Sequence, residues 1–256
     1  MNRLLLNKLC RFQRVYLKDK SIVKIILKSR RIGATWIQAC EDVRDCFNGM
    51  DVWFFSINKS AVDEYMRYVR EWAGFFEKVT KKRFIDRLRS KRALTVTLIN
   101  GHRITGLSSN PLGARSKGGK VVWDEAAHHK SDQEMYTAIS AVSTHRLYPV
   151  RILSSQGSKD SLFYELCQRA ENKETDWSLH KIDIYDAAKD GIFDKLYKRK
   201  LSNEERSNLI KAIKIDVGEA IFEQEFCCNP VDSSVAWLSI DLIKSAINCD
   251  YGYENY

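Results

Sequence analysis

Prolines, cysteine pairs and long apolar runs are all scarce in this chain. Only three prolines occur in 256 residues, at positions 111, 149 and 230, and no repeat or low-complexity linker divides the sequence, so we expect one main domain. The seven cysteines stand at 10, 40, 46, 167, 227, 228 and 249 without a Cys-x-x-Cys pair, which argues against a zinc or disulfide framework and favours a reducing cytoplasm. No apolar run approaches membrane-spanning length, so the sequence indicates a soluble protein with no membrane partner.

Acidic residues are too few to balance the basic ones. There are 33 Asp and Glu against 42 Lys and Arg, which gives a formal net charge of +9. Nucleic acid is the natural partner of such a chain, because Lys and Arg neutralise backbone phosphates whatever the base sequence. The densest basic stretch is residues 78–92. It is either a contact surface for phosphates or an exposed helix or loop that only meets solvent, and both interpretations stay open.

Short apolar runs predict seven strands, at residues 22–27, 52–55, 94–99, 102–107, 121–123, 150–153 and 177–184. Helical spacing of apolar residues at 36–47 and 60–76 lies between some of these runs. This alternation is typical of an α/β fold with a mainly parallel central sheet and helices on both faces. Asn100-Gly101 lies between two runs and is a hairpin signal, so we expect added antiparallel strands at the sheet.

The first apolar run leads into Lys28-Ser-Arg-Arg-Ile-Gly-Ala-Thr35, which has the position of a phosphate loop. A strand that ends in a glycine-containing turn at a helix N-terminus directs free backbone N–H groups at a phosphate. The usual pattern is G-x-x-x-x-G-K-[ST], and here Gly33 and Thr35 match it whereas Ala34 stands in the lysine position. The loop therefore predicts a nucleotide site whose lysine is displaced.

A second pattern supports the first. The run Val121-Val-Trp123 delivers Asp124 and Glu125 side by side, and two carboxylates at a strand end suit metal-assisted phosphoryl transfer. Alone, the pair could be an ordinary acidic turn, but together with the phosphate loop it favours an NTP-hydrolysing fold. We expect the following His128 and His129 to be polar neighbours of this site, because adjacent histidines point in different directions and no partner cluster indicates zinc.

Together, the loop, the acidic pair and the basic balance resemble the ATPase domain of bacteriophage and prophage terminase large subunits, over roughly residues 10 to 240. Terminase loops often read Ser-Arg-Gln-x-Gly-Lys-Thr, and residues 29–35 follow this pattern except at Ala34. Some members carry the lysine at the front of the loop, where Lys28 stands here. The resemblance implies a P-loop NTPase fold of the ASCE, RecA-like type with three layers.

The resemblance also implies ATP and Mg²⁺ as cofactors, and a role for individual residues. Glu125 would orient the attacking water, Lys28 would hold phosphates, and Arg30 would act in cis on the γ-phosphate, while Thr35 and Asp124 would hold Mg²⁺. ATP binding would involve Gln13 at the adenine together with Lys28, Ser29, Arg30, Arg31, Ile32, Gly33, Ala34 and Thr35. Ser154, Ser155 and Gly157 would form the coupling motif that senses the γ-phosphate.

By the same resemblance, residues 1–235 form the ATPase domain, with a small lid-like portion near 185–230. Residues 236–256 would begin a nuclease domain that is missing, so no nuclease activity is expected. The implied partners are double-stranded DNA, the small terminase subunit and the portal protein of the procapsid. The protein would form a homo-oligomeric ring when assembled, could be monomeric in isolation, and would work in the cytoplasm of the bacterial host.

The sequence thus predicts the motor domain of a viral DNA-packaging terminase, which hydrolyses ATP with Mg²⁺ to move double-stranded DNA into a procapsid. Two alternatives remain. One is a DNA-stimulated, helicase-like ATPase of the same fold class. The other is a DNA-binding or assembly module whose nucleotide site has decayed, which the alanine at position 34 leaves open.

Overall fold

The structure is a computed structural model of the chain, and it describes residues 3–90, 93–108, 118–143 and 147–230. Residues 236–256, expected to begin a further domain, lie outside the described residues. Within the described ranges, no helix is both long and apolar enough to cross a membrane.

A seven-stranded sheet forms the middle layer, in the order β3-β4-β2-β5-β6-β1-β7. All neighbouring strands are parallel except β3 and β4, which pair antiparallel. The predicted α/β fold and its seven strands are confirmed. The strands are β1 (Val23–Lys28), β2 (Val52–Ser56), β3 (Thr95–Thr97), β4 (Arg103–Ser108), β5 (Lys120–Asp124), β6 (Val150–Ser154) and β7 (Ser178–Ile182).

A hairpin and a helix cap explain two features of the sheet, its antiparallel strand pair and the length of its last strand. Gly101 has φ 88° and lies between β3 and β4, so the predicted Asn-Gly hairpin is confirmed. The last strand is shorter than its predicted range of 177–184, because the Asp183 side chain accepts a hydrogen bond from the backbone N–H of Asp186 and begins a helix. Local capping therefore ends an apolar run that hydropathy alone continues.

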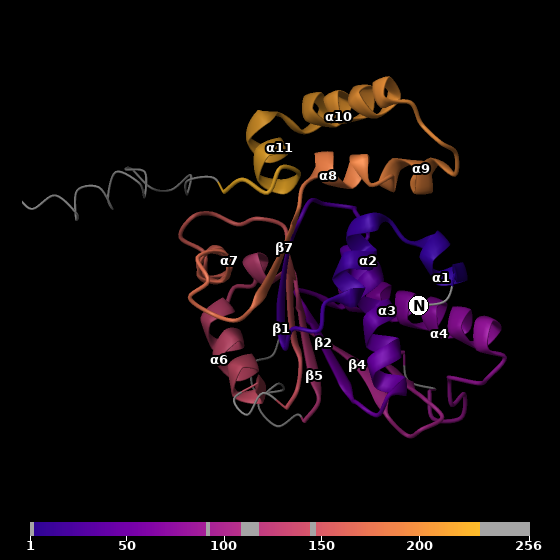
Figure 1. The fold of residues 1–256 in the computed structure, drawn as a ribbon. Coiled ribbons are helices and arrows are strands. Elements are labelled where there is room, and N and C mark those ends of the chain that lie inside the picture. The colour runs from indigo at the N-terminus through magenta and orange to yellow at the C-terminus, as the bar shows by residue number, and fades with distance from the viewer. Residues whose placement is uncertain (1–2, 91–92, 109–117, 144–146, 231–256) are drawn as a thin grey trace, which may run out of the picture.

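Helices cover both faces of the sheet, as Figure 1 shows. On one face α2 (Arg11–Lys18), α3 (Ala34–Phe47) and α4 (Lys59–Thr80) share an apolar core with the sheet, and α1 (Arg3–Lys8) packs beside them. On the other face, a second core holds α6 (Asp132–Ser143) and α7 (Leu162–Glu171). Each apolar face is thus buried against a helical layer, which gives three layers.

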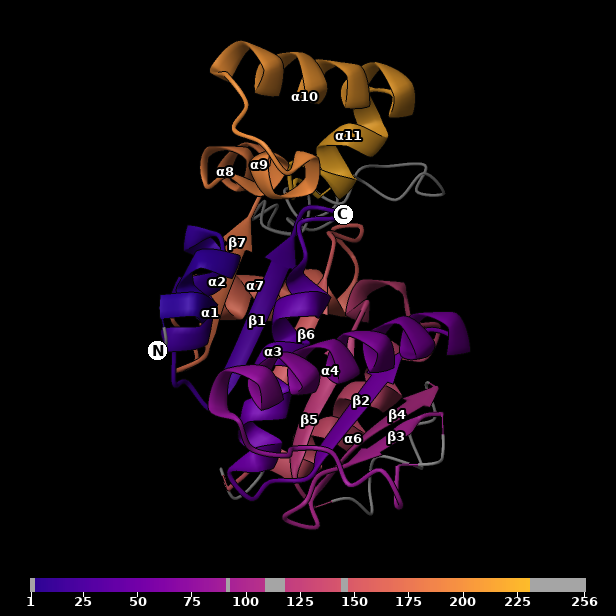
Figure 2. The ribbon, with the colours of Figure 1, turned by 90° about the vertical axis from the view of Figure 1, so that its right-hand side faces the viewer.

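A helical cap lies beyond the carboxyl ends of the strands (Figures 1 and 2). It consists of α8 (Ile184–Lys189), α9 (Ile192–Tyr197), α10 (Asn203–Val217) and α11 (Glu219–Glu225). The chain returns to the sheet after α11, where the carbonyl of Phe226 accepts a hydrogen bond of 2.9 Å from the N–H of Ile184. The helical cap therefore covers the edge of the sheet at which parallel α/β folds bind ligands.

The connections create two crevices at that edge. β1 and β2 lead to α3 and α4 on one face, whereas β5 and β6 lead to η1 (Ala126–His128), α6 and α7 on the other. After neighbouring strands β6 and β1 the chain continues to opposite faces of the sheet, and the same is true of β5 and β2. A crevice therefore opens at the carboxyl ends of each of these two strand pairs. Both openings bear on function below.

A buried ionic network lies near the opposite, amino ends of the same strands. Glu41 of α3 receives the ammonium of Lys24 at 2.6 Å, that of Lys120 at 2.8 Å and the guanidinium of Arg151 at 2.9 Å. Lys120 also pairs with Asp42 at 2.8 Å. The network ties α3 to β1, β5 and β6, since these three cations belong to three different strands.

Candidate nucleotide site

The phosphate loop has the backbone geometry that an anion site needs. β1 ends at Lys28, and the N–H of Ser29 then donates to the carbonyl of Ile182 at 2.8 Å, which anchors the loop to β7. Arg31 and Gly33 have φ of 57° and 77°, in the left-handed region that glycine adopts most readily. α3 begins directly after Gly33 without a side-chain cap, so its first N–H groups stay available to a ligand.

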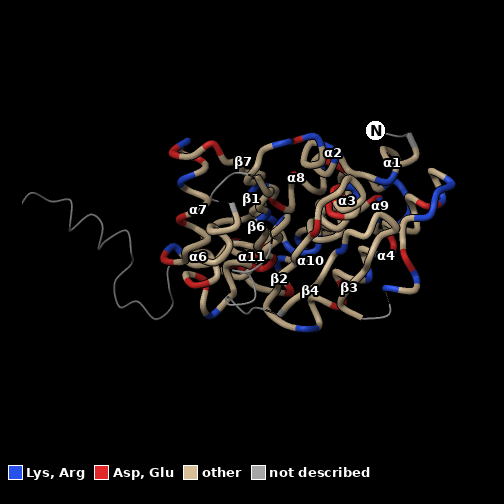
Figure 3. Tube along the Cα trace, turned by 90° about the horizontal axis from the view of Figure 1, so that it is seen from below, with Lys and Arg blue, Asp and Glu red and all other residues tan. Residues whose placement is uncertain are grey.

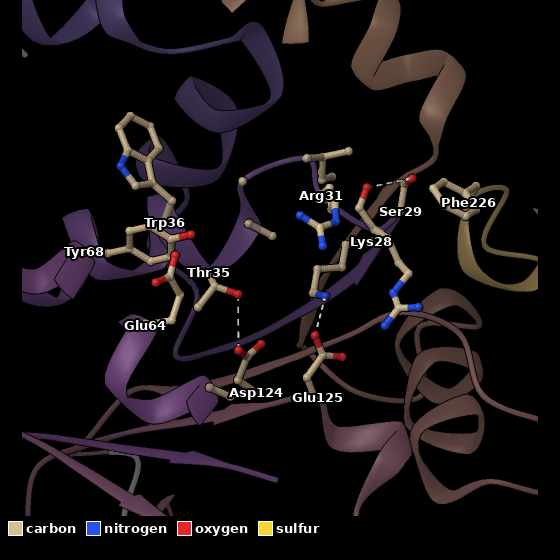
Figure 4. A pocket seen from close by; sticks show the side chains of 15 residues that line it. Lys28, Ser29, Arg31, Thr35, Trp36, Glu64, Tyr68, Asp124, Glu125 and Phe226 are labelled. Carbon is tan, nitrogen blue, oxygen red and sulfur yellow. Dashed lines mark hydrogen bonds and ion pairs between the residues drawn. The ribbon is translucent and has the colours of Figure 1, made fainter. Parts of the chain in front are cut away.

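The displaced lysine and the loop threonine both reach the acidic strand (Figure 4). The Nζ of Lys28 lies 3.0 Å from Oε1 of Glu125, and the hydroxyl of Thr35 donates to Oδ2 of Asp124 at 3.2 Å. β6 separates β1 from β5 in the sheet, so these contacts bridge over its carboxyl end. The structure thus brings together four of the five residues with predicted catalytic or metal-binding roles, all except Arg30.

The charges of these residues are strongly coupled. Burial would lower the pKa of the Lys28 ammonium, but Glu125 and Asp124 outweigh it and raise that pKa above its ordinary value. Burial would raise the pKa of Glu125, yet Lys28 holds it low. Burial and the charge of Glu125 raise the pKa of Asp124 to about 7, against the opposing effect of Lys28. Glu125 therefore carries the negative charge at neutral pH, opposite a charged lysine.

The donor set suits a magnesium ion. A hydroxyl and a carboxylate are oxygen ligands of the kind Mg²⁺ prefers, and those of Thr35 and Asp124 already lie within 3.2 Å of each other. Oδ1 of Asp124 is buried and has no hydrogen-bond partner among the described residues. An orphaned buried carboxylate oxygen is costly, and a bound cation would satisfy it. The residues present therefore fit the ion.

A cavity of about 440 Å³ contains this site. All eight residues of the loop, from Lys28 to Thr35, line it with Asp124 and Glu125. The sequence did not identify its remaining lining residues, which are Trp36, Ala61, Glu64, Tyr68 and Phe226. Tyr68 and Trp36 follow helical spacing and contribute to the apolar core as well, so no sequence signal distinguishes them from core residues.

Gln13 lies in an adjoining cavity of about 430 Å³, which shares Arg31, Gly33, Trp36 and Tyr68 with the first. Its Oε1 accepts a hydrogen bond of 3.0 Å from the N–H of Cys10, and a Cβ added at Gly33 would lie 3.2 Å from its Nε2. The structure therefore places Gln13 beside the loop, at a cavity that continues from the phosphate site.

Arg30 contacts the helical cap, and its charge also helps to lower the pKa of Glu125. Its side chain is 60% exposed, and its Nε lies 3.5 Å from Oε2 of Glu225 in α11. Its backbone N–H donates to the carbonyl of Glu225 at 2.9 Å. The loop and the helical cap are therefore in direct contact, and Glu225 is a partner that the sequence did not indicate.

The three residues predicted to form a coupling motif, Ser154, Ser155 and Gly157, contact the turn after the acidic strand. The hydroxyl of Ser154 accepts the N–H of Ala127 at 3.1 Å, and Oγ of Ser155 lies 3.0 Å from Nε2 of His128. A Cβ at Gly157 would lie 2.9 Å from Oγ of Ser161 and 3.1 Å from the Cβ of Ala127, so a side chain here would force these neighbours to shift. None of the three residues lines the 440 Å³ cavity. They meet the site through the turn that carries Glu125.

The basic stretch begins in the last turn of α4 and continues after that helix as an exposed rim. Figure 3 colours the Lys and Arg positions of the chain blue. Its described basic side chains, all exposed, are Lys78, Lys81, Lys82, Arg83, Arg87 and Arg89. Among described residues only Arg89 has an ion-pair partner, Asp86 at 3.6 Å. The Glu77 carboxylate accepts the N–H groups of Phe84 and Ile85 at 2.8 and 3.1 Å, which anchors the backbone of this rim. Lys91 and Arg92 lie outside the described residues.

The sheet order, the phosphate loop and the acidic strand together define a P-loop NTPase fold of the ASCE type, as predicted. Residues 25–245 match the family described as "Terminase large subunit, T4likevirus-type, N-terminal". The chain belongs to this family.

Relatives and solved structures agree with that membership. The chain is 29% identical over 248 residues to the Mu-like prophage FluMu protein gp28 of Haemophilus influenzae, and 28% identical over 256 residues to the probable terminase large subunit gp28 of Escherichia phage Mu. Each alignment covers 92% of this chain, but 49% and 46% of the relative. The chain thus spans about half the length of these curated relatives.

Two solved structures show the same fold. The ATPase domain of the large terminase of Thermus phage P74-26 aligns with a TM-score of 0.70 at 14% identity, over 90% of this chain and 98% of that one. The large terminase of a thermophilic bacteriophage, solved in complex with ADP, aligns with a TM-score of 0.61 at 13% identity, over 88% of this chain and 54% of that one.

Proposed function

We propose that this chain is the ATPase motor domain of a DNA-packaging terminase, and that it hydrolyses ATP with Mg²⁺ to drive double-stranded DNA into a procapsid. The observation that carries the proposal is the double contact between loop and strand, Lys28 to Glu125 and Thr35 to Asp124. A lysine displaced from the usual motif position still meets the acidic pair there.

The residues divide the work by their chemistry. Lys28 exchanges Glu125 for the β- and γ-phosphates when ATP enters, because phosphate oxygens offer it more negative charge. Glu125, released from the lysine, orients the attacking water. The exposed guanidinium of Arg30 turns from Glu225 to the γ-phosphate, where its permanent charge stabilises the transition state. Thr35 and Asp124 would hold Mg²⁺, and the ion would supply charge neutralisation at the phosphates.

The adjoining cavity gives the adenine a place beside the phosphates. Gln13, with a donor and an acceptor on one amide, suits the base edge, and Trp36 and Tyr68 offer aromatic surface on the cavity wall. Ser154, Ser155 and Gly157 act as the coupling motif, since they contact the turn that carries Glu125.

The domain limits and partners follow from the same proposal. Residues 1–235 form the ATPase domain, and the helical cap corresponds to the lid-like portion near 185–230. Double-stranded DNA, the small terminase subunit and the portal protein are its partners in the cytoplasm of the bacterial host, and copies assemble into a ring.

The direct test is turnover by the chain and by Glu125→Gln, with Glu165→Gln on the exposed surface of α7 as a control for the same change. We expect ATP hydrolysis that requires Mg²⁺, a loss of about 100-fold or more in kcat for Glu125→Gln, and the parent rate for the control. Turnover of Glu125→Gln within about threefold of the parent would contradict the role of this carboxylate.

The two alternatives give different results. A decayed nucleotide site predicts no Mg²⁺-dependent hydrolysis in the parent chain. A helicase-like ATPase predicts separation of DNA strands during turnover, whereas a packaging motor moves duplex DNA intact. A strand-displacement assay with a fluorescent duplex separates these two outcomes.

A further inference from the structure

A third cavity, also of about 430 Å³ and separate from the one that contains Gln13, opens at the same edge of the sheet as the nucleotide site. It lies at the crevice between β2 and β5, where the chain leaves toward α4 on one face and α6 on the other. We call it the histidine cavity. Its lining residues are Ile57, Asn58, His128, His129, Lys130, Ser131 and Met135. Crevices of this kind are where open α/β sheets bind ligands.

The lining of the histidine cavity favours an anion. Lys130 is exposed and forms no ion pair with another described residue, and no acidic side chain is among the lining residues. α4 and α6 both begin at the cavity, where Asn58 Oδ1 accepts the N–H of Ala61 at 2.9 Å and the carbonyl of Ser131 accepts that of Met135 at 3.0 Å. The N-terminus of α4, whose first turn has no acidic residue, adds partial positive charge to that of the lysine, whereas α6 carries Asp132 and Glu134 in its first turn.

The size and composition of the cavity favour a phosphate of a nucleic-acid backbone over a base. Among the described residues that line the cavity there is no Trp, Tyr or Phe, so they offer a base no aromatic platform on which to stack. A flexible lysine that ends in a compact ammonium suits a backbone phosphate. The chain has 42 basic and 33 acidic residues, and its net charge of +9 attracts such a polyanion.

Two lining residues also hold the catalytic turn in place. Nε2 of His129 donates to the carbonyl of Asp124 at 3.0 Å, and His129 is only 9% exposed. Nε2 of His128 lies 3.0 Å from Oγ of Ser155, and the backbone N–H of His128 donates to the carbonyl of Glu125 at 2.9 Å. Glu125 itself has φ 55°, a conformation that a glutamate keeps only when its surroundings hold it.

We propose that the histidine cavity binds a backbone phosphate of double-stranded DNA, and that His128 is the positioning residue through which bound DNA sets the orientation of Glu125. The proposal rests on the proposed ATPase function and deepens it. Lys130 contacts the phosphate, and the neighbouring histidine turn changes its hydrogen bonding to Ser155. DNA thereby raises the turnover of ATP at the adjacent site.

The first experiment tests binding. Lys130→Glu is compared with Lys211→Glu, an equal charge change on the exposed surface of α10, by fluorescence anisotropy with a random-sequence duplex. We expect Lys130→Glu to weaken binding about fivefold and to lower the salt slope by about 1, with little change for Lys211→Glu. Equal weakening in the two variants, or none in either, would overturn the cavity as a DNA site.

The second experiment tests positioning. His128→Ala, His128→Gln and the parent are compared for the ratio of ATP turnover with duplex to turnover without it. We expect the ratio to fall toward 1 for His128→Ala while duplex affinity stays within about twofold. His128→Gln keeps a hydrogen-bonding group for Ser155 and recovers part of the ratio. If His128→Ala keeps the ratio of the parent, the positioning role is wrong. The role is also wrong if His128→Ala loses duplex affinity together with the ratio, because His128 would then act in DNA binding.

These outcomes are separable from failure of the ATPase proposal. Absence of Mg²⁺-dependent hydrolysis in the parent chain contradicts the ATPase function itself. Intact hydrolysis with duplex binding that ignores Lys130 contradicts only the histidine cavity.

Discussion

Lys28 reaches the acidic pair from the front of the phosphate loop, although the usual lysine position is occupied by Ala34. Its backbone belongs to β1, while its ammonium lies 3.0 Å from Oε1 of Glu125, the residue directly after β5. A four-carbon stem spans this separation, so the position of a lysine along a loop is a weaker constraint than the place where its charge arrives. The buried Lys28 ammonium keeps its charge because two carboxylates compensate for the loss of water.

Gly33 allows a test of the loop backbone at the residue scale. Its φ of 77° disfavours any side chain, and an added Cβ would lie 3.2 Å from Nε2 of Gln13. We expect Gly33→Ala to lower the free energy of unfolding by about 1 kcal/mol and to weaken nucleotide binding. Gly74→Ala is the control, because nothing lies within 4 Å of an added Cβ there and α4 favours alanine. The free energies of unfolding are measured with urea. A gain in stability for Gly33→Ala as well as for Gly74→Ala would contradict the claim that the backbone at Gly33 disfavours a side chain.

At the scale of secondary structure, α3 connects the nucleotide site with the buried ionic network. Its first turn presents Thr35 to the nucleotide site, and its second half places Glu41 among three buried cations from β1, β5 and β6. Burial would raise the pKa of Glu41, but Lys120, Arg151 and Lys24 outweigh it and hold that pKa well below 4.5. The ionic network therefore fixes the helix that carries the phosphate loop.

We expect Glu41→Gln to lower the free energy of unfolding by about 3 kcal/mol at pH 7, because the buried cations lose their shared anion. The pKa of this carboxyl is lower in the folded state, so its contribution is fully present above the ordinary pKa and is lost as pH falls through the folded value. The difference between parent and variant should be constant from pH 7 to about 5 and shrink below 4.5. Glu64→Gln, in an exposed pair with Arg67, is the control and should change stability by about 0.5 kcal/mol or less. A small effect for Glu41→Gln at pH 7 in urea unfolding would contradict the role of the network.

Sequence periodicity located the strands and the loop because these features are local. Apolar runs mark the strands, Gly33 and Thr35 mark the turn into α3, and Asp124-Glu125 follows its strand directly. The ionic network was not predicted, since Lys24 stands inside an apolar run and its partner Glu41 is 17 residues away. Glu225 and Phe226 were also missed as site residues, because only the return of the chain after the helical cap brings them to the loop. Local patterns thus indicate the site, and tertiary contacts complete it.

At the scale of the whole molecule, the helical cap and the sheet meet around the nucleotide. Arg30 contacts Glu225, and the side chain of Gln224 donates to the carbonyl of Gln156 at 3.1 Å, just beyond Ser154 and Ser155. A change at the γ-phosphate can therefore reach the helical cap both through the loop and through the end of β6.

In the proposed function, the basic rim at the end of α4 is a further contact surface for DNA. We expect Lys81→Glu/Lys82→Glu to weaken binding of a random-sequence duplex about equally for all sequences, and to lower the slope of log K against log salt by about 2. Lys198→Glu/Lys200→Glu, a matched change on exposed residues after α9, serves as the control. Salt titrations by anisotropy check this, and identical slopes for the parent and both variants would leave the rim without a part in DNA binding.

The central claim is that Lys28 performs the work of the missing loop lysine, and the kcat for Mg²⁺-dependent ATP hydrolysis by Lys28→Ala tests it most directly. Removal of the ammonium leaves phosphate charge uncompensated in the transition state, so kcat should fall about 100-fold or more, and Lys28→Arg should recover part of it by restoring the charge. Thermal unfolding of each variant confirms that it is folded. A kcat for folded Lys28→Ala within about threefold of the parent would contradict the account.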